Sequence, residues 1–112
     1  AVPTFNFDSL TAFAGEDKEA SASIIRTFAE ETRKSISLLQ TALDSTARAD
    51  ASRVAHKLIP LFSMLGATAL VAQLRMLEKN DESLTDDGWH RLLSDVIRQA
   101  TQLVAQAVER CL

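Results

Sequence analysis

Apolar residues recur along most of the chain at intervals of three and four residues, the spacing that places side chains on one face of an α-helix. The clearest run lies near the C-terminus, where intervals of four and three alternate. Its members are Trp89, Leu93, Val96, Ala100, Leu103 and Ala107. No segment shows the strict alternation of apolar and polar residues that is typical of a half-buried strand. The pattern therefore predicts an all-α protein.

Four long helices follow from these repeats and from the residues that interrupt them. We expect helices over Glu16 to about Leu43, Ala51–Leu65, Ala67–Lys79 and about Asp86–Arg110. Asp50 is a plausible N-cap for the second of them, and Gly66 ends it. Residues 80–87 are polar and predict a loop.

The N-terminal segment carries signals of its own. Residues 1–7 are expected to be extended, with Phe5 and Phe7 as apolar anchors, and Asp8 can cap a short helix that Gly15 ends. Long amphipathic helices with short connections are typical of helix bundles. We therefore expect a four-helix up-down bundle with an additional short N-terminal helix, in which residues 1–112 form a single domain.

Composition and charge narrow the range of functions. The chain is 46% hydrophobic and 24% charged, and its formal net charge of −3 gives no general attraction to nucleic acid or to an anionic membrane. Its one cysteine excludes an internal disulfide and a cysteine metal cluster. His90 has no second histidine at helical spacing, and no glycine-rich phosphate loop is present, so we expect no metal and no cofactor. A start at Ala1, without Met, suggests a piece of a longer protein.

The stretch AHKLIPLFSMLGA, residues 55–67, places a proline four residues after His56 within a predicted helix. Pro60 cannot donate the backbone bond that the carbonyl of His56 would accept. With Val54 at 0° on a helical wheel, the apolar face centres at about 30° and His56 falls at about 200°. His56 is therefore expected to face away from the core.

The neighbours of His56 suggest a binding surface. Ile59 and Pro60 bracket the ring with apolar surface that no partner within the chain needs, which suits docking. Arg53 and Lys57 lie within one turn and would favour an anion beside the ring, although they could equally be part of a solvated helix face. A triad of Ser52, His56 and Asp50 can be drawn, but it would have no cleft to exclude water.

The residues Ala55-His56-x-Leu58, followed by Leu65-Gly66-Ala67, resemble the signature of the histidine-containing phosphotransfer (HPt) domain. Chain length and helix order resemble that family over essentially the whole chain. The chain departs from the signature at Ile59, where the family usually has lysine, and at Pro60, where it usually has glycine. Several family members place a glutamine beside the imidazole where this chain has Glu78.

The resemblance implies phosphorelay signalling. His56 would accept a phosphoryl group from an aspartate of a response-regulator receiver domain and pass it to a second receiver aspartate. Arg53, Lys57 and Glu78 would adjoin the phosphoryl group. Mg²⁺ would come from the receiver, and the domain would be a carrier and not an enzyme. The expected docking residues are Ser52, Ile59, Pro60, Ser63 and Met64.

The resemblance also suggests a setting. The parent protein is expected to be a bacterial hybrid sensor histidine kinase, with this domain in the cytoplasm, as the cytoplasmic part of an inner-membrane protein, without membrane contact of its own. Receiver and kinase domains of the same polypeptide are expected partners, and nucleic acid is not. An alternative is a helical interaction module that is not phosphorylated, because Ile59 and Pro60 replace the usual pair. A third is a metal-dependent or hydrolytic bundle enzyme.

Overall fold

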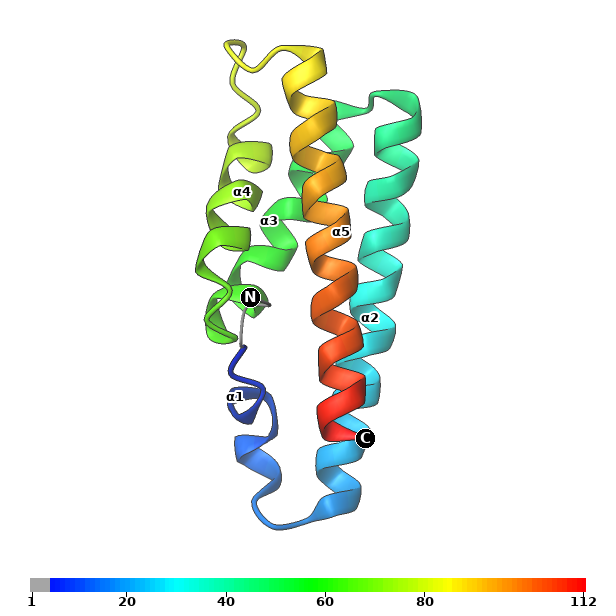
Figure 1. Cartoon of the computed structure of the whole chain (residues 1–112), viewed down its shortest axis with the longest axis vertical. Coiled ribbons are helices and arrows are strands. Elements are labelled where there is room, and N and C mark those ends of the chain that lie inside the picture. The colour runs from blue at the N-terminus through cyan, green and yellow to red at the C-terminus, as the bar shows by residue number, and fades with distance from the viewer. Residues whose placement is uncertain (1–4) are drawn as a thin grey trace.

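Short turns separate four long helices that run alternately up and down, as the computed structural model of the chain shows (Figure 1). The structure describes residues 5–112, so the expected extended conformation of residues 1–4 lies outside the described residues. The helices are α1 (Asp8–Thr11), the 3₁₀ turn η1 (Ala12–Ala14), α2 (Lys18–Ser45), α3 (Arg48–Met64), α4 (Thr68–Lys79) and α5 (Asp86–Cys111). Residues 5–112 contain no strand, which confirms the predicted all-α bundle with a short N-terminal helix.

The turns between the helices use backbone conformations with positive φ. Thr46, which ends α2, has φ of 52°, and Asn80, which ends α4, has φ of 50°. Gly66 has φ of 71° in the tight connection between α3 and α4, where the lack of a side chain removes the steric cost of that conformation. These reversals make each pair of consecutive long helices antiparallel.

Two predicted N-caps are wrong. Asp50 does not begin α3, because the turn at Thr46 lets the chain re-enter a helix at once, with Ala47 as the N-cap. Asp50 lies in the first helical turn, where its carboxylate pairs with Arg53. Asp8 is likewise the first residue of α1 and not its cap, which is Phe7.

The core contains the apolar faces that the spacing predicts. All six residues of the C-terminal repeat have 0% relative exposure. They meet Ile25 and Leu39 of α2, Phe62 of α3, and Leu74 of α4. Around the bundle, α3 packs between α2 and α4, while α5 also packs against both. This order leaves the outer side of the α3 and α4 pair open to solvent.

The N-terminal segment covers one end of the bundle. The backbone N–H of Asn6 donates to the carbonyl of Leu65 at 2.9 Å, and Phe7 and Leu10 are buried. The segment therefore packs where α3 turns into α4 (Figure 1).

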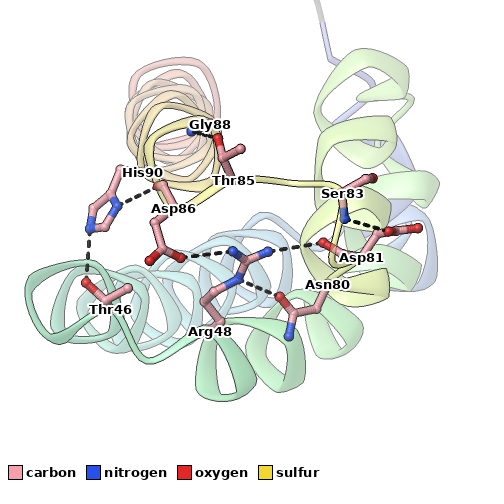
Figure 2. Close-up of polar contacts among 9 residues, drawn as sticks. All are labelled: Thr46, Arg48, Asn80, Asp81, Ser83, Thr85, Asp86, Gly88 and His90. Atoms are coloured by element: carbon pink, nitrogen blue, oxygen red, sulfur yellow. Dashed lines mark hydrogen bonds and ion pairs between the residues drawn. The ribbon is translucent and has the colours of Figure 1, made fainter.

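Arg48 holds the opposite end of the bundle together (Figure 2). Its guanidinium donates to the side chain of Asn80 at 2.8 Å, to the carboxylate of Asp86 at 3.0 Å and to the carbonyl of Asp81 at 3.3 Å. It also lies over the ring of Trp89, 5.9 Å from the centroid. One side chain at the start of α3 thus fixes the end of α4, the following loop and the start of α5.

Candidate functional site

His56 projects from the middle of α3 into solvent. Its side chain is 80% exposed, whereas Ala55 and Leu58, on either side of it in the motif, are buried. The prediction that His56 faces away from the core is confirmed. A histidine so exposed is accessible to a reactant that approaches from outside the bundle.

Glu78, in the last turn of α4, fixes the imidazole ring. Its Oε2 lies 2.5 Å from Nδ1 of His56, and the hydroxyl of Ser52 donates to the Glu78 backbone carbonyl at 2.6 Å. Because an ionised carboxylate can only accept, Nδ1 carries the hydrogen, and in the neutral ring the lone pair is then on Nε2. Nε2 has no hydrogen-bond partner among residues 5–112. The ring is therefore oriented through one nitrogen and free at the other.

A shallow depression surrounds His56, which we call the His56 depression. It is lined by Ser52, Arg53, His56, Lys57 and Glu78. All three residues expected beside the phosphoryl group, Arg53, Lys57 and Glu78, are thus brought together with His56. Ser52 is only partly exposed, because its hydroxyl bonds to α4.

The two cations of the depression differ in what else they contact. The guanidinium of Arg53 pairs with Asp50 in the preceding turn. Lys57 is exposed and also lines a second depression between α2 and α3, with Glu31. Each of these cations therefore also adjoins residues outside the His56 depression.

The expected exposure of Ile59 is wrong. Its exposed fraction is 8% and it belongs to the core cluster. The buried face of α3 extends farther around the helix than the wheel suggested, toward the side on which Ser52 contacts Glu78 of α4. Ile59 is therefore a packing residue and does not offer surface to a partner.

The other expected docking residues are accessible. Pro60 and Ser63 are exposed, and Met64 is 44% exposed. The helix α3 continues through Pro60 to Met64, so the proline does not end it. The carbonyl of His56 nevertheless lacks the N–H that residue 60 would otherwise donate. An accessible strip of Pro60, Ser63 and Met64 therefore extends from His56 toward the α3–α4 turn.

His90 is not part of this site. Its Nδ1 donates to the carbonyl of Asp86 at 2.7 Å, and its Nε2 accepts from the hydroxyl of Thr46 at 3.2 Å (Figure 2). The ring also packs edge-on against Trp89, with centroids 5.0 Å apart. Across residues 5–112, no three His, Cys, Asp or Glu side chains gather in a way that could hold a metal ion.

Sequence reasoning missed Arg75. It lies three residues before Glu78 and lines a groove between α3 and α4 with Ser63, Thr68, Val71 and Ala72. We call this the Arg75 groove. A wheel of the α4 segment alone would have placed Arg75 and Glu78 on neighbouring positions of one face. The spacing of three residues was thus a usable signal.

A comparison with protein families shows to which family the chain is related. A family model for the Hpt domain matches residues 23–110. This chain belongs to the Hpt domain family. Searches of curated proteins and of solved structures each give no significant match. Hpt domains carry a phosphoryl group on a histidine in phosphorelays and interact with receiver domains, and they are phosphocarriers, not catalytic domains.

The family match covers all four long helices of this Hpt domain except the first turns of α2 and the end of α5. The segment that covers the end of the bundle, with Phe7 and Leu10, precedes the match. Within the described residues, no helix combines the length and apolar character needed to cross a bilayer.

Proposed function

We propose that His56 is the phosphorylated residue of this Hpt domain, and that it accepts a phosphoryl group from a receiver aspartate and passes it to another. The observation that supports this most is the Glu78 contact, which orients an 80% exposed imidazole through Nδ1 and leaves Nε2 without a partner among residues 5–112. A nucleophile in this reaction needs a lone pair, access and a fixed direction of approach.

The transfer follows from the ring's hydrogen bond. The lone pair of Nε2 attacks phosphorus, the N–P bond forms, and the P–O bond to the receiver aspartate breaks with its electron pair going to that carboxylate. Positive charge develops on the ring, and the Nδ1–H donated to Glu78 stabilises it. In the return step a second receiver carboxylate attacks phosphorus, and the N–P pair returns to Nε2. No proton leaves the ring in either direction.

The receiver supplies the rest of the reaction. In-line phosphoryl transfer depends mainly on positioning and on neutralising charge. We propose that Mg²⁺ is held by the receiver and that this domain needs no cofactor. The receiver would cover the His56 depression and contact Pro60, Ser63 and Met64, which lie exposed beside it.

The setting we propose is a hybrid sensor histidine kinase of a bacterium, with this domain in the cytoplasm and with receivers of the same or another polypeptide as partners. The support is the Hpt family match, since Hpt domains interact with receivers.

Label transfer from a phosphorylated receiver tests the proposal. Wild-type protein should acquire label that is acid-labile and base-stable, and His56→Gln should acquire none. His90→Gln is the matched control, because it removes the other histidine and should keep the label. A receiver that binds without transferring label to the wild type would favour the alternative, a non-phosphorylated interaction module.

A further inference from the structure

Phosphorylation of His56 would create a charge problem in the His56 depression. A phosphoryl group brings close to two negative charges next to a ring whose other nitrogen already contacts the Glu78 carboxylate. Arg53 is paired with Asp50, so its charge is largely compensated. Lys57 lines this depression and also the second one, which Glu31 lines, and it forms no ion pair among residues 5–112. The depression therefore offers one cation without an ion pair, Lys57, against the combined negative charge of a phosphoryl group and the Glu78 carboxylate.

Arg75 lies at a height along the bundle from which it can supply further positive charge to a phosphoryl group on His56. On antiparallel α3 and α4, Glu78 contacts Ser52 and His56, while Arg75 shares a groove with Ser63. Ser52 and Ser63 bracket His56 along α3, so the stretch of α4 from Arg75 to Glu78 runs beside it.

The side chain of Arg75 is also uncommitted. It is exposed, and within residues 5–112 it forms neither an ion pair nor a side-chain hydrogen bond. Nε2 of His56 has no partner among residues 5–112, so a phosphoryl group on it would be accessible to a long side chain from α4. A guanidinium presents planar N–H donors that match phosphoryl oxygens.

We infer that Arg75 is a phosphoryl-binding residue, which swings from its groove toward His56 and donates to the phosphoryl oxygens on Nε2. The inference rests on the proposed phosphorylation of His56 and goes further by assigning the cation to α4. No bond to Arg75 forms or breaks, since the guanidinium acts only through charge and hydrogen bonds. Arg75 would then offset the negative charge of Glu78 one turn away.

Chemical phosphorylation tests this without a receiver. The full chain is treated with phosphoramidate, and phosphohistidine is followed by mass spectrometry and ³¹P NMR. Arg75→Gln should shorten the phosphohistidine lifetime about three- to fivefold, the effect expected from losing one nearby solvent-exposed charge. It should also raise the midpoint of the ³¹P titration, because a cation favours the more ionised phosphoryl group. Arg75→Lys should restore part of both effects.

A matched variant distinguishes the effect of the Arg75 charge at His56 from the general effect of removing a surface arginine. Arg91→Gln removes an exposed arginine from α5 and should leave both readouts unchanged. If the wild type is phosphorylated on His56 and Arg75→Gln matches it in lifetime and titration, the role of Arg75 is wrong while the proposed function stands. If the wild type takes up no phosphoryl group on His56, both are wrong.

Discussion

His56 and His90 are the two histidines of the chain, and their surroundings differ in the one respect that matters for phosphotransfer. Each donates from Nδ1 to an oxygen, that of Glu78 for His56 and the Asp86 carbonyl for His90. Nε2 of His90 then accepts from Thr46, whereas Nε2 of His56 has no partner among residues 5–112. An imidazole whose two nitrogens both form hydrogen bonds has a structural role, here in linking α5 to the end of α2. An imidazole with one nitrogen engaged is oriented and still nucleophilic.

The largest effect should come from exchanging each histidine in turn. His56→Gln should abolish phosphohistidine formation, while His90→Gln should keep it. The His90 variant should lower the free energy of unfolding by about 1 kcal/mol, because the hydrogen bond to Thr46 at the end of α2 and the bond to the Asp86 carbonyl within α5 are lost. Mass spectrometry of the phosphorylated protein and urea denaturation measure the two quantities. Label on His90 in the wild type would contradict the comparison.

Removing the group that orients His56 should have the next largest effect. Glu78→Ala should slow transfer from a phosphorylated receiver by about 10- to 100-fold, since a misdirected nucleophile reaches the in-line position rarely. Glu78→Gln can still accept from Nδ1 through its amide oxygen and should lose less. Rapid-quench measurement of label transfer distinguishes the variants, and equal rates for Glu78→Ala and the wild type would show that the contact does not direct the ring.

A substitution at the other end of the bundle should change the stability of the fold and leave phosphotransfer unchanged. Arg48→Ala should lower the free energy of unfolding by about 2 kcal/mol, because charged hydrogen bonds to Asn80, Asp81 and Asp86 are lost together (Figure 2). Phosphotransfer under conditions where the variant is folded should be unchanged. Thermal unfolding followed by circular dichroism gives the first quantity, and a loss of transfer in the folded variant would show that the two ends are coupled.

The smallest effect concerns the seam between α4, which carries Glu78, and α5, which carries His90. A hydrogen bond from Gln73, and then the contact with Arg98, lowers the pKa of Asp95 below its ordinary value. The ionised Asp95 carboxylate therefore stabilises the fold above about pH 4, and this contribution is lost as the pH falls through the lowered pKa of Asp95. Asp95→Asn should be less stable than the wild type by at most about 0.5 kcal/mol near pH 7, because the group is solvent-accessible.

Urea denaturation of both proteins between pH 7 and pH 3 checks this expectation. The difference between them should shrink toward acid. A difference that grows as the pH falls would have the wrong sign.

Much of the fold could be predicted because it depends on local spacing. The repeat from Trp89 to Ala107 is periodic, and every member is buried. The outward direction of His56 followed from the same periodicity. The start of α3 was missed because it depends on Thr46, a non-glycine residue with positive φ that nothing in the sequence marks.

The site was harder to predict, since it depends on how two helices meet. The burial of Ile59 follows from which side of α3 faces α4, and a wheel of one helix cannot give that direction. The contact of Glu78 with His56 was expected from family resemblance alone, because no spacing rule joins residues on different helices. Arg75 was missed because no spacing rule relates a residue of α4 to His56 on α3, although its spacing of three residues from Glu78 was visible in the sequence.

The tight α3–α4 turn at Gly66 also bears on the order of folding. His56 and Glu78 are 22 residues apart along the chain, and Thr46 and His90 are 44 apart. Doubling the length of a loop adds about 0.6 kcal/mol to the entropic cost of closing it. The helical hairpin that holds His56 and Glu78 is therefore the easier of the two pairings to nucleate. The reactive ring can acquire its orientation before the far end of the bundle has closed.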